Sequence, residues 1–185
     1  MNKEEFDSKL KRRIAQFAVG ASAIRNQGGS GLIEICRNYF ENRIDLEDFF
    51  MLLTKKNEYL TFLDNHTSEI VELFPEEAKS WGAARKGLNL FLRDICYNKY
   101  FADKFQLPTS FIDNNEKLKF LEVPLDNDVA TGLIRHFPAE LPRWNRIKNL
   151  NKEVSEQYQN KAYELAIKER IARIHLDVLF WREKI

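Results

Sequence analysis

The chain has 185 residues, of which 44% are hydrophobic and 31% are charged, so it can bury one core or two small, closely packed ones. Its 29 Lys and Arg residues nearly balance its 28 Asp and Glu residues, and the net charge of +1 indicates no class of partner. The only cysteines, Cys36 and Cys96, are too few for a four-cysteine zinc or iron–sulfur site or a disulfide-rich scaffold. They read as core residues in a reducing compartment.

The N-terminal residues 1–13 are polar, and no apolar run approaches the roughly 20 residues of a membrane span. We therefore expect an intracellular, cytoplasmic protein without a membrane partner, associated with the nucleoid if its source is bacterial. The sequence does not indicate an oligomeric state.

Apolar residues recur at helical spacing along most of the chain, and alternating β-branched segments are scarce, so we expect an all-α fold. The first helix is predicted over residues 4–19, and the glycine-rich segment 26–31 breaks the pattern. Helices are also predicted over residues 31–41, over 45–53 with Asp45 as the N-cap, over 56–73 and over 79–101.

The second half of the chain is less regular. Residues 103–123 show the weakest pattern, a helix is predicted from Asp126 to about Phe137, and residues 138–146 form a loop punctuated by prolines. A long helix is predicted from about residue 152 to the end. Its apolar positions repeat every three or four residues and form a narrow seam of Ile167, Ile171, Ile174, Val178 and Trp181.

Charge is unevenly distributed around Asp126. Residues 81–104 and 135–148 are both locally basic, and they flank the acidic segment that contains Asp126 and Asp128. Basic segments of this kind bind a polyanion in some proteins and form ordinary solvated helix faces in most. Both interpretations stay open at this point.

Two short segments carry candidate chemistry. Lys86 lies near the predicted start of an apolar helix, next to Arg85, where the helix dipole and the neighbouring cation disfavour an ammonium group. A neutral lysine amine is a nucleophile, although most lysines lie at the surface with an extended stem. Asp126 and Asp128 begin a helix, where one aspartate serves as the N-cap and the second has no structural explanation beyond exposure.

The segments ARKGLNLFL (84–92) and PLDNDVATGL (124–133) resemble the two signature segments of the helix-hairpin-helix DNA glycosylases, which include endonuclease III and the 8-oxoguanine DNA glycosylases. The resemblance implies that Lys86 is the nucleophile and Asp126 the catalytic aspartate, while Asp128 occupies a position usually held by histidine and takes a capping or supporting role. Residues 17–27 look like the early family helix, and 171–181 are similar to the late helix beside the active site.

The resemblance implies a helix-hairpin-helix glycosylase fold over residues 1–185, with the site between two small lobes. One lobe would comprise about residues 30–125, and the other would comprise the N- and C-terminal helices. The sequence lacks the cluster cysteines and the glycine-rich family hairpin, having LFPEEAKSWGAARK (73–86) instead. No iron–sulfur cofactor or other metal site is expected, and an ion at the hairpin is the only cofactor that the resemblance implies. Residues 97–120 look like an insertion.

The resemblance also implies which residues contact a damaged duplex. Asn26 and Gln27 would fill the gap left by a flipped base, and Trp81, Trp144 and Phe137 are candidates for stacking on that base, with core packing as their alternative role. His136 and His175 receive no role. The candidates for phosphate contacts are Arg85, Arg93, Arg143, Arg146 and Lys148.

The functional hypothesis is a DNA glycosylase of base-excision repair that flips a damaged base, with 8-oxoguanine as the first guess, and nicks the strand through a lysine Schiff base. Two alternatives remain. The first is a catalytically inactive DNA-binding module of the same fold, and the second is a helical interaction protein in which the motif match is accidental.

Overall fold

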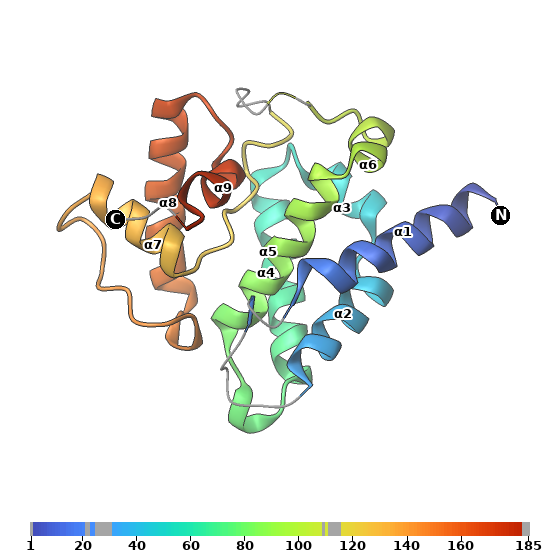
Figure 1. Ribbon diagram of the computed structural model, residues 1–185, viewed down its shortest axis with the longest axis horizontal. Coiled ribbons are helices and arrows are strands. Elements are labelled where there is room, and N and C mark those ends of the chain that lie inside the picture. The colour runs from blue at the N-terminus through green and yellow to red at the C-terminus, as the bar shows by residue number, and fades with distance from the viewer. Residues whose placement is uncertain (1, 21–22, 25–30, 109, 111–115, 183–185) are drawn as a thin grey trace.

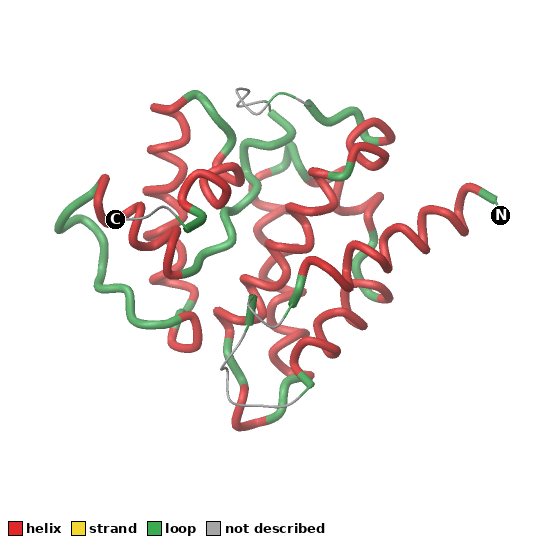
Figure 2. The backbone as a smooth tube through the Cα atoms, in the orientation of Figure 1, coloured by secondary structure: helices red, strands yellow, loops and turns green. Residues whose placement is uncertain are grey.

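A computed structural model describes residues 2–20, 23–24, 31–108, 110 and 116–182. Within these ranges every regular element is a helix and none is a strand, which confirms the all-α prediction (Figures 1 and 2). The elements are α1 (Lys3–Ala18), α2 (Leu32–Asn42), α3 (Leu46–Leu52), α4 (Lys56–Leu73), the 3-10 turn η1 (Glu76–Ala78), α5 (Trp81–Tyr97), α6 (Lys99–Lys104), α7 (Asn127–His136), η2 (Ile147–Asn149), α8 (Lys152–Glu169), η3 (Arg173–His175) and α9 (Leu176–Phe180).

Side-chain caps explain where several helices begin. The Asp45 carboxylate accepts hydrogen bonds from the amides of Glu47 and Asp48, as expected for the start of α3. The single helix predicted over 79–101 is wrong at Asn98, whose side chain accepts from the amides of Tyr100 and Phe101 and starts α6. Such local bonding competes with a continuing helix, so α5 ends at Tyr97.

The long closing helix is also wrong. α8 ends at Glu169 because Arg170 adopts a left-handed conformation with φ 58°, and the chain then turns through η3 into the short α9. The predicted apolar seam is divided by this turn. Ile167, Val178 and Trp181 are 49%, 57% and 63% exposed, so they do not form part of the core.

Two hydrophobic clusters form the interior. The first contains buried residues from α1 to α6 and the following segment to Leu121, together with Ala172 and Ile174. The second contains Val123, Leu125 and the inward faces of α7, α8 and α9. In Figure 1, α7, α8 and α9 lie on one side of α5, and α1, α2, α3 and α6 lie on the other.

This arrangement differs from the expected division into lobes. α1 packs against α2 and α5 within the first cluster, so the N-terminal helix does not pair with the C-terminal helices. The apolar face of α1, with Ile14, Ala15 and Ala18 buried, is covered by α2 and α5. Among the described residues, no helix is both long and apolar enough to cross a bilayer.

α5 is the central helix of the molecule. Every residue from Gly82 to Leu92 is buried, because α5 contacts α1, α2, α4 and α6 as well as η2 and α8. A helix buried on all sides is normally apolar throughout. α5 instead carries the charges of Arg85 and Lys86 into the interior, and these charges require partners.

Candidate functional site

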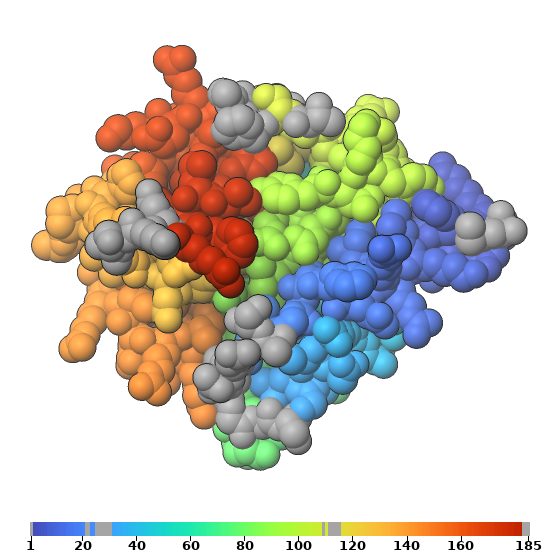
Figure 3. Space-filling model, viewed as in Figure 1, coloured from blue at the N-terminus to red at the C-terminus, as the bar shows by residue number. Residues whose placement is uncertain are grey.

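A cavity of about 590 Å³ opens where α5, α7 and α9 meet the end of α1, and we call it the Lys86 cavity. Figure 3 shows the C-terminal segment, in red, lying against α5, in green, on this face of the molecule. The walls carry three cationic and three acidic side chains, which are Lys86, Arg93, Arg182, Asp126, Asp128 and Asp177.

Lys86 and Asp126 meet in the wall of this cavity. The Lys86 amine Nζ lies 3.3 Å from Asp126 Oδ2, although the two residues are 40 positions apart in the chain. The Lys86 side chain is 9% exposed and that of Asp126 is 26% exposed. Lys86 lies in the second turn of α5, not at the helix terminus that the sequence suggested.

Asp126 performs two tasks with its two oxygens. Oδ1 accepts hydrogen bonds from the amides of Asp128 and Val129, each at 3.0 Å, and thereby caps α7. Oδ2 is then directed toward Lys86. Because the backbone holds one oxygen, the orientation of the carboxylate is fixed relative to the lysine amine.

Asp128 was expected in a capping or supporting role, and it is not the helix cap. It lies in the first turn of α7, where its negative charge is favourable to the helix dipole, and it is exposed at the wall of the Lys86 cavity. Its Oδ2 accepts a hydrogen bond from the Arg182 amide at 3.2 Å. Asp126 takes the capping position because its extended backbone geometry directs its side chain toward the amides of Asp128 and Val129.

Arg93 contributes to the cavity in a different way from the one predicted. Its guanidinium pairs with Asp94 and with Asp177 of α9, and its side chain is only 18% exposed. Burial raises the pKa of Asp177, and the nearby Asp126 carboxylate adds to the increase, although Arg93 opposes it. Two acidic partners therefore engage Arg93, which does not present a free cation to a phosphate.

Arg85 is the clearest correction among the predicted DNA contacts. It is 4% exposed and its guanidinium donates to both oxygens of Glu122, at 2.8 and 3.1 Å. The same group donates to Asp64 and Thr67, at 3.0 and 3.1 Å. A buried guanidinium that makes four hydrogen bonds to three side chains, two of them carboxylates, is structural, so Arg85 is unsuited to binding a phosphate.

The predicted stacking aromatics pack against the second cluster and lie outside the Lys86 cavity. The Trp81 ring faces the Arg85 guanidinium at 5.2 Å, and the Trp144 indole donates to Asn127 at 2.7 Å. Phe137 lies under the Lys161 amine at 4.7 Å. Their alternative role, core packing, fits these contacts.

The remaining predicted contacts differ in what the structure says of them. Arg143, Arg146 and Lys148 are exposed in the segment that links α7 to α8. The Lys148 amine also approaches the Glu77 carbonyl at 3.5 Å. Asn26 and Gln27 lie outside the described residues.

The hairpin segment between α4 and α5 is unlike a phosphate-binding turn. Glu76 and Glu77 of η1 are exposed there and would repel a phosphate. Ser80 caps α5 by accepting from the Ala83 amide at 3.1 Å, and its hydroxyl donates to the Lys148 carbonyl at 3.2 Å. η2 therefore covers the beginning of α5. No group of three or more ligand side chains within the described ranges is placed to hold a metal ion.

The sequence interpretation missed several residues of the cavity. Tyr97, Asp177 and Arg182 line it, and the exposed rings of Phe17 and Trp181 also belong to its walls. The similarity of residues 171–181 to a helix beside the family's active site could have indicated these cavity residues. The prediction of one continuous helix instead assigned Trp181 to an apolar seam.

Comparison of the chain with protein-family models, with curated proteins and with solved structures gives no match.

Proposed function

We propose that the protein is a DNA glycosylase with associated strand-nicking activity, acting on a damaged base flipped out of duplex DNA. The observation that supports this proposal is the Lys86–Asp126 pair, with 3.3 Å between Nζ and Oδ2, in the wall of a cavity of about 590 Å³. A cavity of this size accommodates a single base with its sugar. The paired groups are a nucleophile and a fixed carboxylate.

The chemistry assigns one task to each group. As the bond between the base and the sugar C1′ breaks, the base leaves with the electron pair and the sugar acquires positive charge, which the Asp126 carboxylate stabilises. The Lys86 amine forms a bond to C1′, and loss of a proton from nitrogen and opening of the sugar ring give a Schiff base. Loss of a C2′ proton then breaks the C3′–O bond and nicks the strand.

Surface features favour a nucleic-acid substrate. Exposed Arg143, Arg146 and Lys148 follow α7, the helix that Asp126 begins, and are candidates for phosphate contacts. Phe17 and Trp181, which are 76% and 63% exposed, flank the cavity with aromatic surface suited to unstacked bases. Binding through phosphates predicts an affinity that falls steeply with salt concentration.

The test is borohydride trapping of the Schiff base. Wild type and Lys86→Gln are incubated with duplexes that contain an abasic site or 8-oxoguanine, and hydride reduces any iminium to a stable amine. We expect a covalent protein–DNA band with wild type and none with Lys86→Gln. Lys104→Gln is the matched control, because Lys104 also pairs with an aspartate, Asp7, at 2.9 Å but does not line the cavity.

Other results separate the alternatives. Release of free base without a trapped band would indicate a glycosylase that uses Asp126 without a lysine adduct. Tight, salt-sensitive binding to abasic DNA without base release or a band would favour the inactive DNA-binding module. Absence of binding as well would overturn the proposal in favour of a helical interaction protein.

A further inference from the structure

Two arginine–aromatic pairs lie at the opening of the Lys86 cavity. Phe17 of α1 and Trp181, which follows α9, are 76% and 63% exposed and belong to the cavity walls. The guanidinium carbon of Arg13 lies 5.9 Å from the centre of the Phe17 ring. The guanidinium carbon of Arg182 lies 4.9 Å from the centre of the Trp181 ring. Figure 3 shows α1, in blue, and the C-terminal segment, in red, on one face with α5, in green, between them, so the two pairs come from different walls.

Both arginines are available to an anion. Arg13 and Arg182 are exposed, and within the described residues neither guanidinium forms an ion pair with a carboxylate. An arginine that lies against an aromatic ring still presents N–H donors to a phosphate. Residues 8–20, which include Arg13, contain four cationic residues and no acidic one, so this part of α1 also attracts an anion through its local charge.

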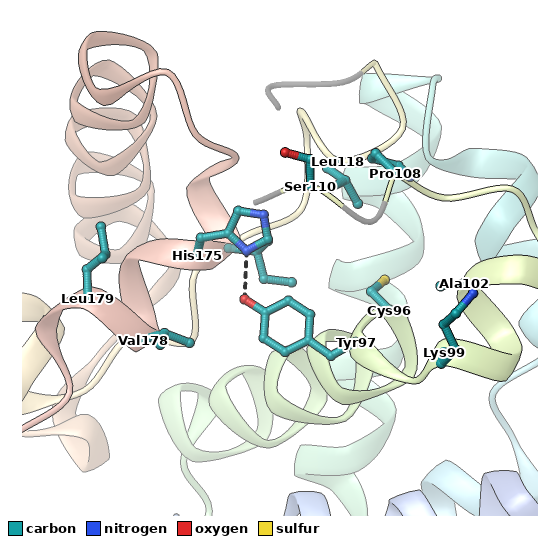
Figure 4. A pocket seen from close by; sticks show the side chains of 11 residues that line it. Cys96, Tyr97, Lys99, Ala102, Pro108, Ser110, Leu118, His175, Val178 and Leu179 are labelled. Atoms are coloured by element: carbon teal, nitrogen blue, oxygen red, sulfur yellow. Dashed lines mark hydrogen bonds between the residues drawn. The ribbon is translucent and has the colours of Figure 1, made fainter. Parts of the chain in front are cut away.

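Other donors beside the cavity already have partners. Arg93 pairs with two carboxylates. The Tyr97 hydroxyl lies 2.7 Å from His175 Nδ1, as the dashed line in Figure 4 shows. The Lys99 amine, in the same view, is bound by both oxygens of Asp103 at 2.5 and 2.6 Å. A phosphate beside the cavity is therefore bound more readily by the arginines of the two arginine–aromatic pairs.

The interior of the cavity does not favour a phosphate. Apart from Arg182 at the opening, its walls carry two cationic side chains and three acidic ones. A nucleotide can place its uncharged base in such an interior, whereas its phosphates are repelled by the excess of carboxyl groups. The phosphates on both sides of that nucleotide then lie outside, at the height of the two arginines.

We propose that Arg13 and Arg182 bind the backbone phosphates on the two sides of the flipped nucleotide, and that the Phe17 ring stacks on a neighbouring base. This inference rests on the proposed function, because it names the residues that hold the strand whose base enters the Lys86 cavity. Phosphate contacts position a strand without reading its sequence, and an aromatic ring stacks on any base. The contacts thereby position the sugar of the flipped nucleotide for reaction.

The probe is duplex DNA that contains a tetrahydrofuran abasic-site analogue, which has no C1′ hydroxyl and cannot form a Schiff base. Fluorescence anisotropy measures its Kd for the full-length protein between about 50 and 200 mM NaCl, and each phosphate contact adds about 0.9 to the slope of log Kd against log salt concentration. Arg13→Gln and Arg182→Gln should each lower this slope by about 0.9 and raise the Kd about tenfold at low salt. The double variant should lower the slope by about 1.8.

Two further variants separate stacking from charge. Phe17→Ser should raise the Kd about tenfold and leave the salt slope unchanged, because it removes aromatic surface but no charge. Lys99→Gln is the matched control, since it removes an exposed cation of α6 whose charge Asp103 already compensates, and it should change neither quantity. All four substituted side chains are exposed, and circular dichroism checks that each variant is folded.

Each part of the proposal can fail. An unchanged slope for either arginine variant, an equal fall for Lys99→Gln, or no binding of wild type to this duplex would overturn the phosphate contacts. Wild-type affinity of Phe17→Ser would overturn the stacking.

Failure of this inference is distinguishable from failure of the proposed function. A trapped Schiff base together with unchanged slopes would retain the glycosylase and reject the arginine contacts. Lowered slopes without trapping or base release would retain the contacts on a DNA-binding protein that is not a glycosylase.

Discussion

Arg85 and Lys86 are consecutive residues of α5 with almost the same exposure, 4% and 8%, yet their surroundings differ fundamentally. Arg85 is enclosed by Glu122, Asp64 and Thr67, with hydrogen bonds of 2.8 to 3.1 Å. Lys86 has one carboxylate partner, Asp126, at 3.3 Å and faces a cavity. Burial alone therefore does not distinguish a charge enclosed by protein partners from one that a ligand can reach. The number of hydrogen bonds to the charged group and its access to a cavity do distinguish them.

The buried cluster around Glu122 connects the two halves of the interior. Asn89 also donates to Glu122 at 2.9 Å, and Arg173 donates to the carbonyls of Phe120, Leu121 and Gln159. These contacts fix residues 120–125, the segment that leads directly to Asp126. The structural charges thus hold Asp126 in place beside Lys86, and this connects the two regions.

The largest expected effect concerns the reactive pair. Asp126→Asn retains a good N-cap side chain but loses the carboxylate charge, so base release or trapping should fall by about 10²- to 10⁴-fold. Asn caps helices as well as Asp does, so the expected fall of about 1–3 kcal/mol in the free energy of unfolding reflects the lost carboxylate partner of buried Lys86. Single-turnover kinetics and urea unfolding measure the two quantities. Unchanged base release and trapping by Asp126→Asn would show that Asp126 acts only as a cap.

In the buried cluster around Glu122, we expect substitution to reduce stability strongly. Glu122→Gln removes the fully buried carboxylate partner of Arg85 and leaves only the half-buried Asp64, so it should reduce the free energy of unfolding by about 3–5 kcal/mol. Lys86→Gln is its matched partner and should change stability by about 1 kcal/mol or less, because the Asp126 carboxylate remains partly solvated. Urea unfolding compares the variants directly. Similar losses for both would remove the distinction between the two charges.

The two glycines of α5 extend the comparison to packing. A Cβ on Gly82 would lie 2.2 Å from the Ile147 carbonyl oxygen, so Gly82→Ala should cost about 1–3 kcal/mol by pushing η2 away. A Cβ on Gly87 would have its nearest contact at 3.6 Å, with Phe40. Gly87→Ala should therefore be neutral or stabilising by up to about 1 kcal/mol, because alanine is the better helix former. Thermal unfolding compares the stabilities of the two variants. A Gly82→Ala variant more stable than Gly87→Ala would contradict the close contact of Gly82 with η2.

The sequence was sufficient for the helical class, for most helix boundaries and, through the family resemblance, for Lys86 and Asp126 as a candidate pair. The prediction of Arg85 as a phosphate contact was wrong for two reasons. Consecutive residues of a helix point about 100° apart, so Arg85 does not share the direction of Lys86. Its partner Glu122 lies 37 positions away in the chain. Asp177 was missed because Ile171, Ile174 and Val178 imitate a continuing helix. The left-handed turn at Arg170, a non-glycine residue, carries no local signal that would have ended that pattern.

The smallest expected effect is a difference in pH dependence between Glu122 and Asp177. Burial would raise the pKa of Glu122, but the Arg85 guanidinium and its hydrogen bonds bring that pKa below the usual 4.5. The stability due to Glu122 is therefore present above about pH 4.5 and declines as pH falls through the folded-state pKa. Asp177 behaves oppositely, because burial and Asp126 raise its pKa above 3.8. Its contribution is present below pH 3.8 and declines as pH rises through the folded-state pKa.

Unfolding by urea between about pH 3 and pH 7 separates these contributions when wild type is compared with Glu122→Gln and with Asp177→Asn. The advantage of wild type over Glu122→Gln should shrink toward acid pH. Relative to Asp177→Asn, wild type should instead lose stability as pH rises. We expect opposite slopes because cationic groups outweigh the effect of burial at Glu122. At Asp177, burial and the nearby Asp126 outweigh a guanidinium that is shared with Asp94. Parallel slopes would mean that the two carboxylates occupy equivalent environments.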